Sequence, residues 1–85
     1  MTHPATTVYS KPDCVQCNAT YRALDKKGVH YTVVDLTQDP TALNYVRQLG
    51  HQQAPVVVIA TSTQPVHWSG FQPALINEHF GSAAA

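Results

Sequence analysis

Apolar positions along the chain alternate between short runs of strand length and stripes at helical spacing. Short segments rich in β-branched and aromatic residues predict strands over residues 6–10, 30–35, 56–60 and 65–68. Between and after these segments, apolar residues recur every three to four positions, which predicts helices over residues 14–26, 40–49 and 73–80. The predicted order is therefore β-α-β-α-β-β-α.

The first predicted helix has signals at both ends. Asp13, followed three residues later by Gln16, fits a capping box and places the helix N-terminus at Cys14. Two lysines and then Gly28 are typical of a helix C-terminus. Because this helix joins two strands, the three elements form a βαβ unit. We expect its strands to be parallel, with a right-handed crossover.

The other two helices begin with proline. Asp39 can cap the second helix, Pro40 occupies its first position, and Gly50 ends it. Pro73 opens the third helix in the same way.

The last two strands differ in their expected place in the sheet. The unbroken apolar run over residues 56–60 is typical of a central strand covered on both faces. Pro65 confines the following strand to a sheet edge. The fold class is α/β, with a four-stranded mixed sheet flanked by three helices. We expect a single domain over residues 1–85, with a flexible tail at residues 81–85.

Charge and composition restrict the partners and the compartment. Five lysines and arginines balance five aspartates and glutamates, so no summed field draws in nucleic acid or an anionic membrane. No segment approaches the roughly 18 apolar residues that a membrane span needs, and the first residues do not resemble a signal peptide. We expect a cytoplasmic protein, monomeric by default, that binds neither nucleic acid nor membrane.

Cys14 and Cys17 are the only cysteines, and their spacing permits three kinds of site. A structural staple across so short a loop would stabilise the fold by only about 2 kcal/mol, and thiols stay reduced in the cytosol. A metal site needs further ligands, and the five histidines form no closely spaced second pair, although a dimer could share two pairs of thiols. A lone C-x-x-C between a strand and a helix favours a redox dithiol.

Position on the predicted helix gives the two thiols unequal roles. Cys14 lies at the first turn, where free amide N–H groups and the helix dipole favour a thiolate, so it is the candidate nucleophile. Cys17 faces inward within disulfide reach and is the candidate resolving thiol. Lys11 can add a positive charge nearby, whereas Asp13 opposes the thiolate unless its carboxylate is occupied as the cap.

Pro55 directly precedes the predicted central strand, an unusual place for proline. A cis Ala54–Pro55 bond would turn the chain sharply there, whereas base rates alone favour a trans bond.

Three segments, CVQC, QAPVVV and HWSGFQP, together resemble the NrdH-redoxins of the thioredoxin superfamily, the glutaredoxin-like electron donors of class Ib ribonucleotide reductase. The resemblance runs from about residue 7 to about residue 80 and implies the thioredoxin/glutaredoxin fold and a cis bond before Pro55. It adds to the cysteines a set of site-shaping or partner-binding residues: Lys11, Val15, Gln16, Ala54, Pro55, Trp68, Ser69, Gly70 and Phe71.

The resemblance also implies partners and an electron source. It implies reduction by thioredoxin reductase, with NADPH as the remote source, and transfer to the large subunit of class Ib ribonucleotide reductase. We expect no bound cofactor or metal, with the Cys14–Cys17 disulfide as the redox centre. The chain lacks the C-P-Y-C motif and the late Gly-Gly-x-x-Asp stretch of glutaredoxins that use glutathione. It departs from the family at Gln72, where arginine is usual, so that an amide replaces a cation.

Two alternatives stay open at this point: a glutathione-dependent glutaredoxin, and a metal or iron–sulfur binding module with the cysteines as ligands.

Other polar and aromatic side chains have simpler interpretations. Trp68 is either a packed aromatic residue or a partner contact, and Phe71 is expected in the core. Thr20 is expected to bond back into its own helix. The histidines are expected on the surface, with His67 the one candidate for a place near the site, and the tyrosines are expected to be packing residues.

Overall fold

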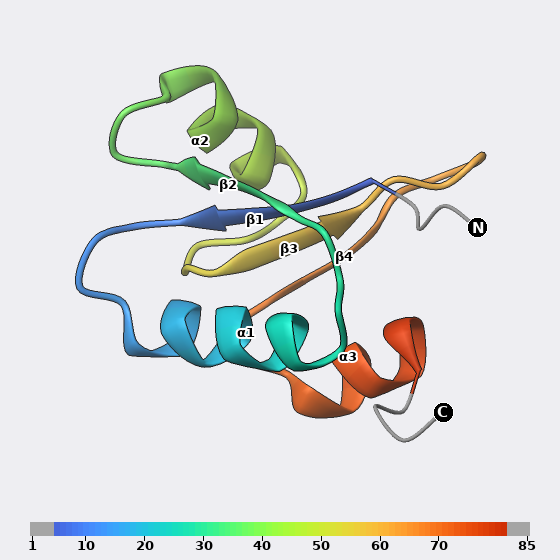
Figure 1. Ribbon diagram of the computed structural model, residues 1–85. Coiled ribbons are helices and arrows are strands. Elements are labelled where there is room, and N and C mark those ends of the chain that lie inside the picture. Colours follow the sequence, from blue (N-terminus) through green and yellow to red (C-terminus); the bar gives the residue numbers. More distant parts are fainter. Residues whose placement is uncertain (1–4, 82–85) are drawn as a thin grey trace.

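The structure is a computed structural model that describes residues 5–81, and its elements follow the predicted order (Figure 1). The elements are β1 (Thr6–Ser10), α1 (Val15–Lys26), β2 (Thr32–Asp35), α2 (Pro40–Gln48), β3 (Val56–Ile59), β4 (Val66–Ser69) and α3 (Pro73–Phe80). Residues 82–85 of the predicted tail lie outside the described residues. Within residues 5–81, no helix has the length and apolar character needed to cross a bilayer.

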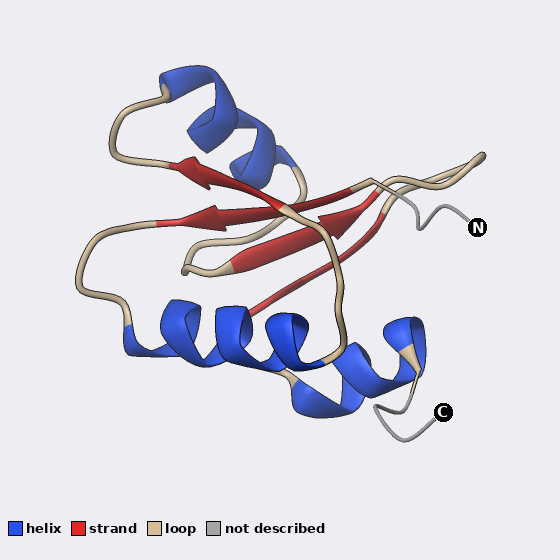
Figure 2. Ribbon diagram, in the orientation of Figure 1, coloured by secondary structure: helices blue, strands red, loops and turns tan. Residues whose placement is uncertain are grey.

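The four strands form one mixed sheet in the order β2-β1-β3-β4 (Figure 2). β1 pairs in parallel with β2, as the βαβ unit predicts, and β3 is antiparallel to both of its neighbours. β4 lies at an edge, which confirms the interpretation of Pro65. Val8, Val57 and Trp68 lie in register across the three strands β1, β3 and β4.

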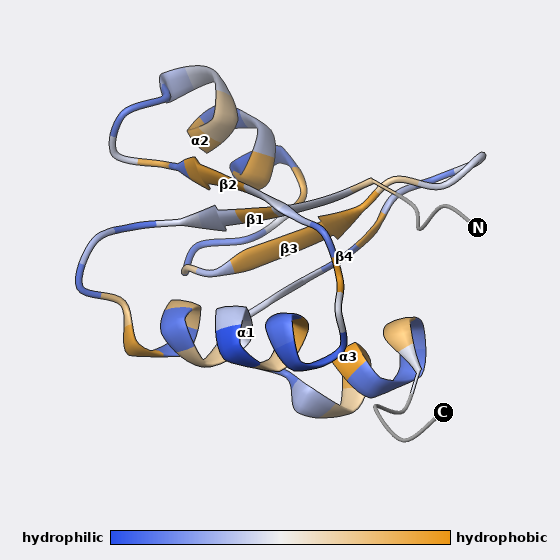
Figure 3. Cartoon of the chain, viewed as in Figure 1, coloured by the Kyte–Doolittle hydropathy of each residue, from blue (hydrophilic) through white to orange (hydrophobic). Residues whose placement is uncertain are grey.

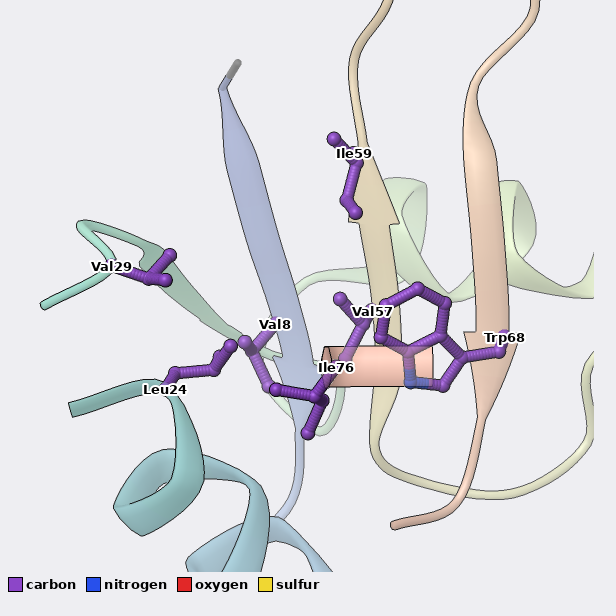
Figure 4. Packing of buried hydrophobic residues seen from close by; sticks show 7 residues of the cluster. All are labelled: Val8, Leu24, Val29, Val57, Ile59, Trp68 and Ile76. Atoms are coloured by element: carbon purple, nitrogen blue, oxygen red, sulfur yellow. The ribbon is translucent and has the colours of Figure 1, made fainter. Parts of the chain in front are cut away.

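Helices cover both faces of the sheet, with α1 and α3 on one side and α2 on the other (Figure 1). Because side chains alternate along a strand, neighbouring residues of β3 enter different layers. All four residues of β3 are buried, as expected for a central strand. The strand is hydrophobic along its length (Figure 3). The core on the α1 and α3 side consists of Val8, Leu24, Val29, Val57, Ile59, Trp68 and Ile76 (Figure 4). The smaller core under α2 consists of Val46, Val56 and Val58.

Three strands differ from the prediction by one or two residues at their ends. β2 begins at Thr32 rather than at residue 30. Tyr31 instead stacks on Tyr21, with ring centroids 5.9 Å apart, and donates a hydrogen bond to Asp25 at 2.9 Å. Burial and that carboxylate raise the pKa of Tyr31 to about 12. β3 ends one residue early, at Ile59, and β4 is displaced by one residue toward the C-terminus.

Residues next to the second and third helices behave as predicted. The Asp39 carboxylate accepts a hydrogen bond from the Ala42 N–H at 3.0 Å, and Pro40 occupies the first position of α2. Pro73 does the same in α3. Gly50 follows α2 with a φ of +94°, a left-handed conformation that glycine adopts without strain.

Candidate functional site

The candidate site lies at the end of the sheet where β1 finishes and β3 starts (Figure 1). Tyr9 pairs with Val56, so Pro55 lies level with the end of β1, where the chain turns into α1. The Ala54–Pro55 peptide bond is cis, as the family resemblance implies, and the Pro55 carbonyl accepts a hydrogen bond from the Gly70 N–H at 2.8 Å. Strand register thus brings together the start of α1, the turn before β3 and the turn after β4.

The two cysteines form a disulfide at the start of α1, with their Cα atoms 5.2 Å apart. Cys14 is 7% exposed and Cys17 is 1% exposed, so the more accessible cysteine is the predicted nucleophile. Within residues 5–81, no cluster of three or more histidine, cysteine, aspartate or glutamate side chains could hold a metal ion. The site therefore presents a single disulfide whose outer sulfur is Cys14.

Cys14 itself caps α1, which corrects the predicted capping box. Its Sγ accepts a hydrogen bond from the Cys17 N–H at 3.1 Å. Asp13 lies one residue before the cap, with a φ of +58°, a left-handed conformation that aspartate tolerates better than most residues. The Asp-x-x-Gln signal predicts the helix start to within a residue but assigns the capping atom wrongly, because a sulfur acceptor is not part of the usual pattern.

Gln16 links α1 to the turn after β4. Its Oε1 accepts a hydrogen bond from the Phe71 N–H at 2.9 Å, across 55 positions of sequence. The next helical turn carries the bond expected for Thr20, whose hydroxyl donates to the Gln16 carbonyl at 2.9 Å. The Gln16 side chain is therefore held by the turn after β4 and does not cap the helix.

Gly70 occupies a position where only glycine fits without displacement. Its φ is +81°, and an added Cβ would lie 3.1 Å from the Gln16 Oε1 and 3.5 Å from the Gln53 Nε2. Three segments therefore meet at Gly70: the dithiol helix, the loop before Pro55, and the turn after β4.

Two large apolar side chains near the cysteines face solvent. Val15, between the cysteines, is 79% exposed, and Phe71 is 37% exposed. The expected core position of Phe71 is therefore wrong, because its backbone N–H is held by Gln16 in the turn before α3. Apolar surface next to a reactive disulfide is suited to contact with a protein partner.

Trp68 is a core residue and not a surface contact. It is 5% exposed, belongs to the core on the α1 and α3 side (Figure 4), and stacks on His79 with ring centroids 5.6 Å apart. Its Nε1 has no hydrogen-bond partner among the described residues. Of the two interpretations that the sequence left open for Trp68, packing is the one observed.

A groove of about 690 Å³ lies beside the site, between α2 and the loop before Pro55. Lys11 and Arg47 line it together with polar residues of the loop, and no carboxylate does so within the described residues. Its apolar lining includes Leu43 and Val46 from α2. The sequence singled out Lys11 and Ala54, but not Arg47, because a single cation on a helix carries no signal of its own.

His51 and His67 contact one another and are half-buried, which corrects the expectation that they are exposed on the surface. The His51 Nε2 and the His67 Nδ1 are 2.7 Å apart, and the rings meet edge to face with centroids separated by 4.9 Å. Partial burial and the neighbouring His67 lower the pKa of His51. His51 also lines the groove.

Gln72, in the position of the usual family arginine, makes a local contact. Its Nε2 donates a hydrogen bond to the Ser69 carbonyl at 3.2 Å. At the end of β1, the Ser10 hydroxyl accepts a hydrogen bond from Tyr21 at 2.5 Å. Both bonds brace the segments around the disulfide without adding charge.

Sequence comparisons find related redox proteins over most of the chain. A profile of the glutaredoxin family matches residues 6–62. The glutaredoxin-like protein NrdH of Escherichia coli strain K12 is 38% identical over 71 residues, which are 84% of this chain and 83% of that protein. The gene 56 protein of Mycobacterium phage D29 is 33% identical over 72 residues, 85% of this chain and 78% of that protein.

Solved structures give the same result. NrdH-redoxin from Escherichia coli, whose activity profile is described as thioredoxin-like, superimposes with a TM-score of 0.77 at 39% identity. The match covers 87% of this chain and 92% of that one. A glutaredoxin from Archaeoglobus fulgidus also reaches a TM-score of 0.77, at 20% identity, and supports the fold alone.

Proposed function

The chain belongs to the glutaredoxin family as a thiol-disulfide oxidoreductase of the NrdH-redoxin type, and we propose that it carries electrons from thioredoxin reductase to the large subunit of a class Ib ribonucleotide reductase. The observation that carries this proposal is the Cys14–Cys17 disulfide at the N-terminus of α1, with the Cys14 sulfur as the helix cap. NADPH is the remote electron source and is not bound by this chain.

The position of Cys14 supports its role as the nucleophile. In the reduced protein, the Cys17 N–H that donates to its Sγ can stabilise a thiolate there, together with the positive end of the α1 dipole. Cys17 lies further inside and one turn along the same helix, as a resolving thiol requires.

The reaction is two exchanges at sulfur. The Cys14 thiolate attacks a target disulfide, forms a mixed disulfide, and releases one target sulfur as a thiolate that takes a proton from water. The Cys17 thiolate then attacks the Cys14 sulfur, forming the Cys14–Cys17 disulfide and releasing the second target thiolate. Two electrons pass to the target, and thioredoxin reductase restores the dithiol.

The surface around Cys14 supports a protein as the partner. Val15 and Phe71 provide exposed apolar contacts, and Ala54 borders the groove that Lys11 and Arg47 make positive. We assign Lys11, Val15 and Phe71 to partner contact. Four further residues shape the site: Gln16, Pro55, Ser69 and Gly70.

The electron source is tested by NADPH consumption with insulin as the disulfide acceptor. We expect rapid turnover with thioredoxin reductase and little with glutathione plus glutathione reductase. Class Ib ribonucleotide reductase supplied with this protein should then form deoxyribonucleotides. A preference for glutathione would contradict the proposal and favour a glutathione-dependent glutaredoxin. Stoichiometric zinc or iron without disulfide reduction would instead indicate a metal-binding module.

A further inference from the structure

The His51–His67 contact joins two segments that border the dithiol site. His67 lies on β4 opposite Val58, a core residue of the α2 side, so its ring points to the α2 face of the sheet. His51 follows the end of α2, where its N–H donates to the Val46 carbonyl at 3.1 Å. The two rings therefore tie the edge strand to the beginning of the loop that leads to Pro55.

This loop is anchored at its two ends and free between them. At the start of the loop, the His51 ring contacts His67 on β4. At its end, the Pro55 carbonyl accepts a hydrogen bond from the N–H of Gly70, in the turn that follows β4. Within residues 5–81, no hydrogen bond holds residues 52–54. Gln53 nevertheless lies against Gly70, which in turn lies against Gln16 between the cysteines. The position of residues 52–54 beside the disulfide therefore depends on these anchors.

The protonation states of His51 and His67 decide whether their ring nitrogens can form a hydrogen bond. With one ring donating and the other accepting, the contact needs at least one unprotonated nitrogen at the junction. A neutral pair or a singly charged pair satisfies this condition. A doubly protonated pair places two N–H groups and two positive charges against each other, so the contact must open.

We propose that His51 and His67 are positioning residues for disulfide exchange. Their contact holds residues 52–54 in place for an extended polypeptide substrate while the pair carries at most one positive charge, and releases them when both rings are protonated. The inference rests on the thiol-disulfide activity of the chain and not on the identity of its electron donor or acceptor.

The surroundings of the pair oppose the second proton. Lys11 from the turn before α1 and Arg47 from α2 line the groove with His51, and no carboxylate lines it within the described residues. On the sheet side, His67 faces Val58, which carries no charge. Tyr9 and Tyr45 belong to the α2 core, and burial, Tyr45 and the nearby Asp39 carboxylate at the start of α2 raise the pKa of Tyr9. Partial burial and the neighbouring His67 lower the pKa of His51, so we expect the contact to open only in acid.

The test compares two disulfides in single-turnover reactions of the pre-reduced protein between pH 5.0 and 7.5. Insulin presents its disulfides within polypeptide chains that can contact the loop, whereas 2-hydroxyethyl disulfide is too small to do so. Any change in the Cys14 thiolate fraction affects both rates, so the ratio of the insulin rate to the small-disulfide rate isolates positioning. In the wild-type protein we expect this ratio to fall about fivefold from neutral to acidic pH, the effect of losing one hydrogen bond.

Two variants of one residue separate the explanations. In His51→Gln, the amide can donate to or accept from His67 in either protonation state, so we expect the ratio to stay high at every pH. In His51→Ala, the ratio should be low at every pH, with folding checked by circular dichroism. His30→Gln removes an exposed histidine away from the site, and its rate ratio should depend on pH as in the wild-type protein. A constant wild-type ratio, or an equal fall in His51→Gln, would overturn the proposal whether or not thioredoxin reductase is the donor.

Discussion

At the scale of single residues, Cys14 is both the N-cap of α1 and the more exposed sulfur of the disulfide. The Cys17 N–H, a free backbone donor at the helix start, bonds the Cys14 sulfur in the disulfide. After reduction the same N–H is available to a Cys14 thiolate. Gln16, between the cysteines, is equally specialised, because its amide holds the backbone at Phe71. The reactivity of the dithiol and the position of the turn after β4 are thus linked through residues of one helical turn.

Serine substitutions should separate the roles of the two thiols. Cys14→Ser removes the nucleophile, and we expect insulin reduction to fall to the uncatalysed rate. Cys17→Ser removes only the second exchange, so a mixed disulfide with the target should accumulate, visible by intact mass and reversed by dithiothreitol. Equal residual activity in both variants, or no adduct with Cys17→Ser, would contradict the assignment.

Gly70→Ala tests how closely Gly70 packs against the Gln16 side chain. A left-handed alanine is strained by about 1–2 kcal/mol, and here the added Cβ would also press on the Gln16 Oε1 at 3.1 Å. Gly28→Ala provides the matched control, because its φ is also positive, at +70°, and nothing lies within 4 Å of the added Cβ.

In urea unfolding we expect both glycine variants to lose stability and Gly70→Ala to lose more. Only Gly70→Ala should also slow insulin reduction, because only that substitution forces the Gln16 side chain, next to Cys17, to move. Equal losses, with activity intact in both, would show that the contact with Gln16 is unimportant.

At the scale of elements, each helix starts in a different way. α1 is capped by a cysteine sulfur, α2 by the Asp39 carboxylate, and α3 begins at Pro73 without a side-chain cap. The helix with a functional thiol at its cap thus has a weaker acceptor there than α2. The stronger capping acceptor and the reactive thiol therefore lie on different helices.

Replacing the cap of α2 should destabilise the fold without touching the dithiol. For Asp39→Ala we expect a loss of about 1 kcal/mol in the free energy of unfolding, because the Ala42 N–H loses its acceptor. Asp39→Ser retains a capping oxygen and should lose only a fraction of that. Urea unfolding of the two variants checks this, and an equal loss in both would show that the carboxylate acts through something other than the cap.

At the scale of the whole molecule, the fold rests on its two cores and not on the disulfide. The sheet buries Val8, Val57 and Trp68 against α1 and α3, and Val56 and Val58 against α2. The disulfide closes only a short loop at one end of the sheet. A redox carrier of this kind must keep one fold in both oxidation states, and the position of its cores permits this.

Reduction should therefore change stability only modestly. We expect the far-ultraviolet circular dichroism of the reduced protein to match that of the oxidised form, with the oxidised form at most about 2 kcal/mol more stable in urea, the limit set by so short a loop. Cys17→Ser, which cannot form the bond, should give the same unfolding curve with and without reductant. Loss of helical signal on reduction would show that the disulfide is structural.

The sequence by itself determined what depends on neighbours along the chain. Period and capping signals gave the order of elements, the start of α1 and the cap of α2, because these follow from backbone hydrogen bonding within a few residues. The spacing and helical position of Cys14 and Cys17 indicated their order of exposure. The cis bond before Pro55 came only through the family resemblance, because no local signal favours it.

Tertiary structure alone decided what depends on residues far apart in sequence. It placed Trp68 in the core and Phe71 at the surface, although both belong to one motif. Strand register directs the Trp68 side chain inward, and the hydrogen bond that the Phe71 N–H donates to Gln16 holds the turn that exposes Phe71. It also paired His51 with His67 across 16 positions. Neither contact leaves a periodic trace in the sequence, since each depends on where the sheet places its neighbouring strands and loops.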